Sequence, residues 1–243
     1  MKKSLEKNSY LEIKKLFDAK KFDDVISYCQ KLLETDPKNI LALQNISSAY
    51  NMVGAYQDAI KSASIVLEET NDDEFALKNK IFAYEKLNDY NSVLIYCNHM
   101  LIQNKKDVDT LITKGITLNK IGNHDDAILI YKNILKIDKQ NANALVNLAI
   151  TYNHLKQYDD AIKYYDMVQD VMPNLSNTSI EKSRAFEALG KKDDAFLAAQ
   201  GIRLDEAENI KHDAKIKNYS VQHAFELKRF QKSSKTNYND SNW

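Results

Sequence analysis

The chain of 243 residues is long enough to bury a substantial interior as one or two domains. Its 34 basic and 34 acidic residues cancel, which argues against a general nucleic-acid or membrane-surface binder, because such binding needs an excess of Lys and Arg. Five glycines and two prolines are too few for the many turns of a β-rich chain, so we expect long helices joined by short connections.

The first residues and the cysteines indicate where the protein works. Residues 1–7 meet charge again before the apolar core of a signal peptide could form, and no run approaches the about 18 apolar residues of a membrane span. Cys29 and Cys97 are the only cysteines and do not make a disulfide framework. We therefore expect a cytoplasmic protein without a membrane span, in which residues 1–5 form an N-terminal extension.

From residue 6 to residue 205 the chain repeats with a period of 34 residues and no insertion. The copies are 6–39, 40–73, 74–107, 108–141, 142–175 and 176–205. Position 20 is Val or Ala in every copy, and position 21 is always a large apolar residue. Both prolines of the chain, Pro37 and Pro173, fall at position 32, and Gly54, Gly122 and Gly190 fall at position 15. We therefore expect six tandem structural repeats.

Each copy predicts two helices. Positions 4, 7, 8 and 11 carry apolar or small residues at helical spacing, and positions 20, 21, 24, 27 and 28 do so again. Gly or a polar residue at position 15 ends the first helix, and Pro or a polar residue at position 32 ends the second. Small residues at positions 8 and 20 let the two helices approach closely. A single hairpin cannot bury its apolar stripe, so neighbouring copies must stack.

This pattern resembles the tetratricopeptide repeat family, in which small residues at positions 8 and 20 and aromatic residues near 11, 17 and 24 mark a 34-residue helix pair. The resemblance implies an all-α fold, a right-handed α-solenoid (superhelix) of six helix-turn-helix repeats with a C-terminal capping helix. The chain departs from the family at position 7, where Glu12, Lys80, Lys114 and Lys182 replace the usual Leu.

Residues 206–231 are predicted to form one amphipathic helix that covers the last repeat. Its apolar face carries Ile210, Ala214, Val221, Ala224 and Phe225, and lysines and an arginine lie around the rest. The alternative is a basic amphipathic helix that docks on a partner or a membrane. Residues 232–243 are polar and are expected to be disordered, with a terminal Trp243 that could serve as a docking anchor.

Groups that could be mistaken for catalytic residues have a structural explanation. Paired aspartates recur at positions 18 and 19 of four copies, in the first turn of the second helix, where the helix dipole favours carboxylates. His99, His124 and His154 occupy different repeat positions, so we do not expect the histidines to cluster. Cys29 and Cys97 lie two repeats apart, too far for a disulfide. We expect no enzymatic activity, no catalytic residue, no metal and no cofactor.

The resemblance also implies a binding surface, because in the family positions 2, 5, 9, 12 and 13 of the first helix face a concave groove and position 6 contacts peptide backbone. The expected partner-binding residues are Leu41, Gln44, Asn45, Ser48, Phe75, Lys78, Asn79, Phe82, Ile112, Ile116, Asn119, Val146, Asn147, Ile150 and Asn153. The apolar members would form a strip typical of an interaction surface, unless several of them pack between neighbouring first helices. The family's chaperone-carboxylate clamp is incomplete: Lys78 is present at position 5, but Phe82 replaces the needed Asn. In the fifth repeat Asn143 and Asn147 replace the clamp's other cations.

We therefore expect a non-enzymatic adaptor or scaffold that binds a peptide segment of a partner protein in the concave groove. The alternative is a structural protein that self-assembles into homo-oligomers through the strip or through the end repeats. The expected partner is a protein or peptide, not a nucleic acid. The same solenoid serves many different partners, so the sequence alone does not name one.

Overall fold

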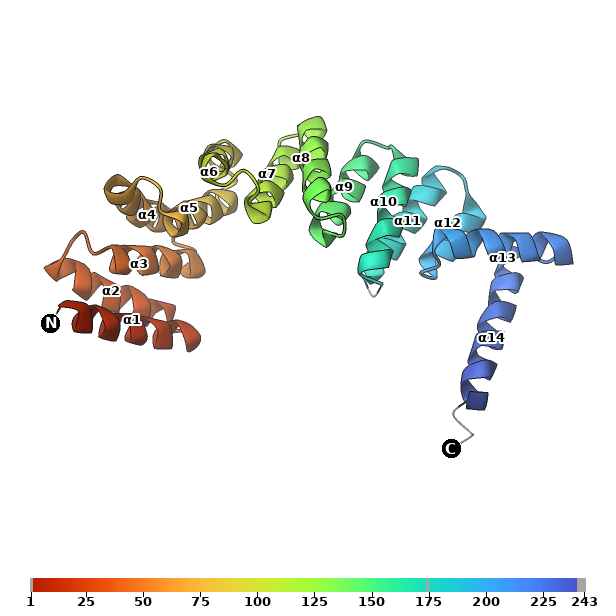
Figure 1. The fold of residues 1–243 in the computed structure, drawn as a ribbon, viewed down its shortest axis with the longest axis horizontal. Coiled ribbons are helices and arrows are strands. Elements are labelled where there is room, and N and C mark those ends of the chain that lie inside the picture. Colours follow the sequence, from red (N-terminus) through yellow and green to blue (C-terminus); the bar gives the residue numbers. More distant parts are fainter. Residues whose placement is uncertain (1, 174, 240–243) are drawn as a thin grey trace. The chain divides into compact units, whose positions relative to one another are not determined.

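The computed structural model describes residues 2–173 and 175–239, and it folds them into fourteen α-helices without a β-strand (Figure 1). The chain divides into two compact units, Met1–Ile121 and Gly122–Trp243. Consecutive helices pack against one another in antiparallel pairs within each unit, which confirms the predicted all-α class. In the described part of the chain, no helix combines the length and hydrophobicity that a membrane crossing requires.

The first unit consists of seven helices, each packed against the next in the chain (Figure 1). They are α1 (Lys2–Asp18), α2 (Phe22–Thr35), α3 (Ile40–Val53), α4 (Tyr56–Thr70), α5 (Glu74–Lys86), α6 (Tyr90–Gln103) and α7 (Val108–Lys120). The helix α1 begins at Lys2, so described residues of the predicted extension 1–5 belong to it. The core of the first unit includes Ile13, Val25 and Cys29, all essentially inaccessible to solvent.

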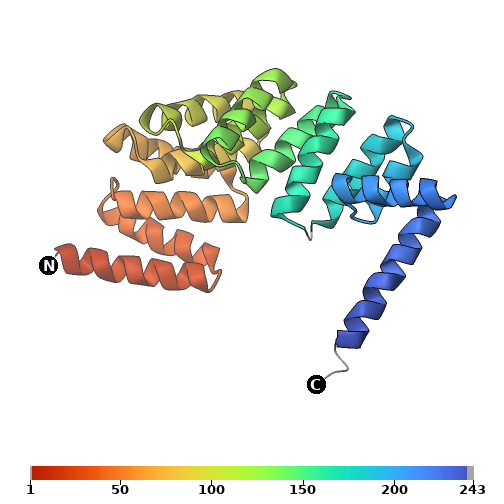
Figure 2. The same cartoon turned by 45° about the vertical axis from the view of Figure 1, so that its right-hand side comes forward.

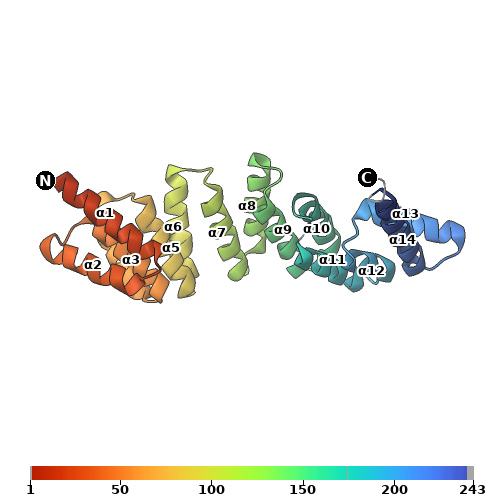
Figure 3. The ribbon, with the colours of Figure 1, turned by 90° about the horizontal axis from the view of Figure 1, so that it is seen from below.

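The second unit contains the remaining seven helices, and α9 to α12 follow one another as antiparallel neighbours (Figure 3). They are α8 (His124–Ile137), α9 (Ala142–His154), α10 (Tyr158–Val171), α11 (Ser176–Ala188), α12 (Lys192–Ala199), α13 (Leu204–Lys217) and α14 (Val221–Asn239). Ile162, Phe186 and Ala195 belong to one buried cluster that joins α10, α11 and α12. The last second helix, α12, has only eight residues.

The helix boundaries follow the 34-residue register. From the second copy on, first helices begin at position 1, as Ile40, Glu74 and Val108 illustrate. Second helices begin at position 17, as Tyr56, Tyr90 and His124 illustrate. The residue at position 15 adopts a left-handed backbone in all six copies, at Lys20, Gly54, Asn88, Gly122, Lys156 and Gly190. This conformation ends the first helix and turns the chain into the second. The prediction of position 15 as the end of the first helix is confirmed.

Side chains at position 34 cap several first helices. Asn39 Oδ1 accepts a hydrogen bond from the Ala42 amide at 3.0 Å, and Asp73 Oδ1 accepts one from the Ala76 amide at 2.7 Å. Such caps satisfy amides at the helix start that have no intrahelical partner. The paired aspartates lie in the first turns of α2, α8, α10 and α12, as predicted.

Two of the three unusual lysines at position 7 are buried but have partners. Lys80 is 6% exposed, donates a hydrogen bond to Ser64 Oγ at 2.8 Å, and lies 4.5 Å from the ring centroid of Tyr96. Lys182 on α11 is 1% exposed and forms an ion pair of 2.6 Å with Asp166 on α10. A buried ammonium is tolerated only with such partners.

Two further acceptors surround the Lys182 ammonium: Gln169 Oε1 at 2.8 Å and the Ile202 carbonyl at 3.3 Å. The same Asp166 carboxylate accepts a hydrogen bond from the Leu204 amide, the first of α13, at 3.1 Å. This network therefore fixes the start of α13 to the fifth and sixth repeats. A Leu at position 7 could not provide that connection.

The C-terminal segment differs from the single helix predicted over 206–231. The structure contains two helices, because Asn218 adopts a left-handed backbone, with a φ of 56°, and ends α13. The second helix, α14, runs away from the end of α13 (Figure 2) and continues to Asn239, into the segment predicted as disordered. Trp243 lies outside the described residues. The predicted apolar face is confirmed, since Ile210, Ala214 and Phe225 are buried against α12.

Candidate functional site

The surface expected to bind a partner is formed in the first unit by the first helices α3, α5 and α7. Phe75 and Phe82 lie seven residues apart on α5, hence on one face, and their side chains are 45% and 36% exposed. Ile112 and Ile116 on α7 are half-buried, and Leu41 on α3 packs against the core. The predicted apolar strip is therefore uneven, with two aromatic side chains on α5 as its accessible part.

A recess of about 350 Å³ opens beside Phe82, between α5 and α7. We call it the α5–α7 recess; its lining residues are Lys78, Ile81, Phe82, Glu85, Met100, Asp109, Thr110 and Thr113. Ile81, Phe82 and Met100 supply apolar surface, while the carboxylates and hydroxyls supply polar atoms. This volume lies within the range of pockets that accept a small group, such as one side chain of a partner.

The electrostatics of the recess are set by its carboxylates. Burial raises the pKa of Glu85, and the nearby ammonium groups of Lys120 and Lys86 act in the opposite direction. The ammonium of Lys78 forms an ion pair with Glu74 of the same helix, and that hydrogen bond raises the pKa of Lys78. Because Lys78 is already paired, Glu85 and Asp109 remain to receive donor groups from a bound segment.

Several polar residues of the predicted surface are engaged within the protein. Gln44 donates a hydrogen bond to Asp73 Oδ2 at 2.7 Å, and Asn45 donates one to the carbonyl of Leu41 at 2.7 Å. Asn79 receives a hydrogen bond from Asn51 on its backbone carbonyl at 3.0 Å. The bond between Asn51 and Asn79 connects α3 with α5, so it joins neighbouring repeats. Ser48 and Asn119 are half-buried.

The four predicted residues of the fifth repeat lie on α9, in the second unit. Val146, Ile150 and Asn153 are half-buried. Asn147 donates a hydrogen bond to the Asn143 carbonyl of its own helix at 2.8 Å. Among the predicted partner-binding residues, the most exposed apolar side chains thus belong to α5, and α9 adds half-buried apolar surface in its own unit.

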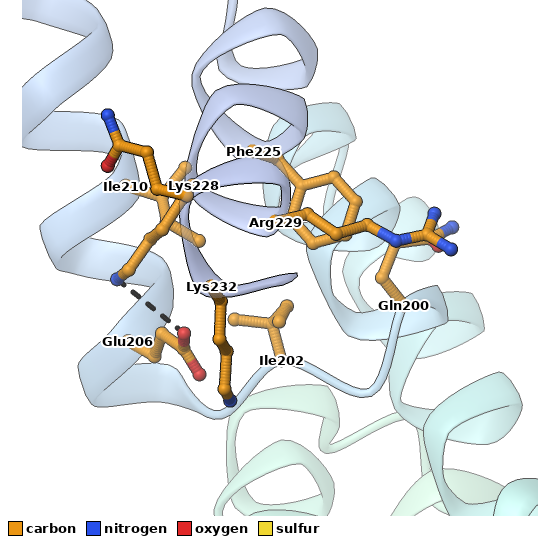
Figure 4. Close-up of a pocket in the computed structure, with 9 residues that line it drawn as sticks. Gln200, Ile202, Glu206, Ile210, Phe225, Lys228, Arg229 and Lys232 are labelled. Atoms are coloured by element: carbon orange, nitrogen blue, oxygen red, sulfur yellow. Dashed lines mark ion pairs between the residues drawn. The ribbon is translucent and has the colours of Figure 1, made fainter. Parts of the chain in front are cut away.

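A larger recess of about 560 Å³ lies among α12, α13 and α14 (Figure 4). Ile202, Ile210 and Phe225 form its apolar part, and the edge of the Phe225 ring meets the Phe196 ring at a centroid distance of 5.6 Å. Its polar rim includes Lys228, which forms an ion pair of 3.5 Å with Glu206. Its apolar floor is continuous with the packing of α14 on α12 and α13, as the predicted capping role requires.

Two histidines that the sequence separates are close in space. The rings of His124 and His154 meet edge to face at a centroid distance of 6.3 Å, so the expectation that the histidines do not cluster is wrong for this pair. Position 17 of one copy meets position 13 of the next when the repeats stack. Among the described residues no group of three or more His, Cys, Asp or Glu could hold a metal ion.

The two cysteines are buried and unpaired with each other, as predicted. Burial raises the pKa of both thiols to about 12. A thiol that keeps its proton is a poor nucleophile. Cys29 and Cys97 therefore serve as core residues.

Glu85 and Asp109 occupy the family's groove positions 12 and 2, but the sequence does not reveal the recess that they line. The recess also uses Thr110 and, from the apolar positions 8 and 27, Ile81 and Met100. Met100 comes from the second helix α6, and no first-helix pattern could have indicated it. Thr113 at position 6, where the second, third and fifth copies carry Asn, was the available signal.

Comparison with known proteins supports the repeat architecture. Residues 120–177 match the family model of the tetratricopeptide repeat. A comparison with curated proteins finds no match. A solved structure of a tetratricopeptide repeat protein from Parabacteroides merdae is similar, with 19% identity, a TM-score of 0.69, and coverage of 79% of this chain and 77% of that one.

Two other solved structures extend the likeness. MamA is 17% identical, with a TM-score of 0.62 over 72% of this chain and 94% of that one. YrrB, described as a tetratricopeptide-repeat protein with an unusual peptide-binding site, is 15% identical, with a TM-score of 0.57 over 82% of this chain and 97% of that one. At these identities the likeness shows the fold alone.

Proposed function

We propose that this chain, a protein containing tetratricopeptide repeats, is a non-catalytic adaptor that binds a segment of a partner protein along its first helices. The observation that carries the proposal is the pair of exposed phenylalanines, Phe75 and Phe82, beside the α5–α7 recess. Aromatic side chains next to a recess are typical anchors of protein interfaces. The peptide-binding site ascribed to YrrB is consistent with this use of the fold.

The chemistry of the recess favours a particular kind of segment. Its apolar part accepts one apolar side chain, and Glu85 and Asp109 accept hydrogen bonds from donors beside it. A carboxylate-rich recess favours a segment with Lys, Arg or amide groups next to the apolar residue. The asparagines of α3 and α5 already form hydrogen bonds within the protein. We therefore assign the affinity for a partner to the side chains of α5 and α7 that line the recess, and not to these asparagines.

The test compares two double variants in partner capture from the native cell. We expect Phe75→Ala with Phe82→Ala to lose the partner, because truncating a central aromatic anchor costs about 2 kcal/mol or more. The matched control is Ile95→Ala with Ile102→Ala, since these α6 side chains are 63% and 76% exposed and lie outside the recess. Circular dichroism checks that both variants remain helical. Equal capture by both double variants would place the binding surface elsewhere.

Self-assembly is the second candidate function. Tyr10 and Leu11, adjacent on α1, are 53% and 52% exposed, which leaves apolar surface on the first helix of the first unit. Contact between two such surfaces would produce homo-oligomers. Sedimentation over a wide concentration range measures this directly, and a mass that stays monomeric at high concentration rejects it.

A further inference from the structure

Four lysines surround an apolar recess of about 420 Å³ between α8 and α10, in the second unit. We call it the lysine recess; it is lined by Lys132, Leu135, Lys136, Lys139, Lys163, Tyr164 and Met167. The four lysines are exposed, while Leu135, Tyr164 and Met167 are half-buried and form an apolar floor. The recess lies on second helices, so it is separate from the first-helix surface of the proposed adaptor site.

The protein neutralises these four ammonium groups only in part, through the charge of Asp160, which acts on Lys132. In the part of the chain that the structure describes, none of them forms an ion pair with a carboxylate. Lys136 donates a hydrogen bond to the neutral Asn133 side chain at 3.2 Å. The Lys132 and Lys163 ammonium groups lie 5.6 Å and 5.9 Å from the ring centroids of Tyr152 and Tyr164. A local excess of positive charge therefore remains on a chain whose total formal charge is zero.

The fold does not require lysine at these places. Lys132 and Lys136 occupy positions 25 and 29 of the fourth copy, and no other copy has Lys at either position. In the fifth copy the same two positions carry Asp166 and Asp170. Lys139 replaces, at position 32, the proline found in the first and fifth copies. The other copies stack without lysines at positions 25 and 29, so repeat packing does not explain why four lysines lie together around this recess.

We propose that the lysine recess binds an acidic segment of a partner protein, with one apolar side chain on the floor and carboxylates against the surrounding ammonium groups. The rim supplies charge complementarity to Asp and Glu, and the floor supplies apolar area that carboxylates alone do not use. A nucleic-acid backbone would use the rim but bury little of the floor, because single strands bind by stacking bases on exposed aromatic faces. Tyr164 instead stacks on Tyr152, with ring centroids 5.6 Å apart.

Fluorescence anisotropy with three labelled probes tests the proposal on the full chain. The probes are a short peptide of glutamates around one Leu–Phe pair, the same peptide with Gln for every Glu, and a single-stranded oligothymidylate. The test variant is Lys136→Glu with Lys163→Glu. The matched control is Lys192→Glu with Lys215→Glu, which changes the same charge at exposed positions on α12 and α13 outside the recess.

We expect the acidic peptide to bind at least about tenfold more tightly than the Gln peptide, and more weakly as salt screens the charges. The test variant should weaken that binding by about tenfold or more, while the control stays near the unmodified protein. The Phe75→Ala and Phe82→Ala changes should leave it unaltered, which separates this site from the adaptor site.

Three kinds of result would overturn the assignment. The first is equal binding of the acidic and Gln peptides, or equal effects of the test and control variants. The second is oligothymidylate binding as tight as peptide binding and equally sensitive to the test variant, which would make the occupant a nucleic acid. The third is self-association that the test variant abolishes, which would make the occupant a second copy of this chain.

Discussion

Replacing Asp166 with alanine is expected to destabilise the second unit by about 3–5 kcal/mol, because the change leaves the buried ammonium of Lys182 without its counter-charge. That ammonium is 1% exposed and loses an ion pair of 2.6 Å. The Leu204 amide loses its bond to the same carboxylate as well, which adds about 1 kcal/mol. Gln169 Oε1 and the Ile202 carbonyl remain as acceptors, but neither carries a charge.

Replacing Lys182 with methionine should cost much less, about 1–2 kcal/mol. Asp166 would keep the Leu204 amide as a donor, and its side chain is 16% exposed, so water can solvate it in part. Methionine also fills the volume of the lysine stem with apolar atoms, and exchange of buried ion pairs for apolar residues is often nearly neutral. The double variant should therefore be no less stable than Lys182→Met alone.

Urea unfolding followed by circular dichroism measures the three free energies of unfolding and completes a double-mutant cycle. Hydrogen exchange should show the loss of protection at the start of α13, where the network attaches that helix. The reasoning is refuted if Asp166→Ala costs less than Lys182→Met, or if the two changes add in the double variant.

The pH dependence provides an independent check on the same pair. Burial lowers the pKa of Lys182 in the folded protein, and the ion pair with Asp166 opposes that shift. Without Asp166 the pKa of Lys182 in the folded protein should fall further. The folded state would then bind the Lys182 proton less tightly than the unfolded state does. Stability then rises with pH towards the ordinary lysine pKa of 10.5. The deficit of Asp166→Ala should therefore shrink as the pH is raised, and a constant deficit would contradict this account.

Two further substitutions and two measurements on the cysteines have defined outcomes. Lys156→Gly should stabilise the protein by about 1 kcal/mol in urea unfolding, because Lys156 has a φ of 59° that glycine adopts without strain. Ala161→Leu should destabilise it by about 1–3 kcal/mol, since Ala161 is fully buried between paired helices; an unchanged melting temperature would show that the contact has room. Cys29 and Cys97, whose pKa values are raised to about 12, should resist alkylation of the folded protein at about pH 8 and react only after unfolding. Because the pKa values of both thiols are raised in the folded protein, the buried thiols should contribute less to stability as the pH rises above their ordinary pKa of 9.0.

The sequence was sufficient to predict the turn between the two helices of each copy, because local chemistry at position 15 decides it. Position 15 is left-handed whether Gly, Asn or Lys occupies it, and the apolar positions repeat without an insertion. Asn218 was an available signal for the break between α13 and α14, since Asn tolerates the left-handed backbone better than most residues. The amphipathic pattern continued on both sides of it and concealed the break.

The candidate site was less predictable, because it depends on contacts between copies. Asn79 matches the family's peptide-contacting position, yet its carbonyl receives a hydrogen bond from Asn51 of the preceding repeat. The proximity of His124 and His154 also arises only when one copy stacks on the next. A pattern read within one repeat contains no information on either contact. Only the exposed fractions seen in the structure therefore distinguish Phe75 and Phe82 from the half-buried residues at equivalent groove positions of other copies.

The constant spacing of the helix starts has a consequence for how such a chain can change in length. Each first helix begins 34 residues after the previous one from Ile40 to Ser176. Duplication or loss of one whole internal copy would recreate packing interfaces of the same geometry between adjacent copies. An insertion of a few residues would instead misalign the packing interfaces that follow it in the chain. Natural variation in such a protein is therefore expected in steps of one module, each adding or removing one first helix available to a partner.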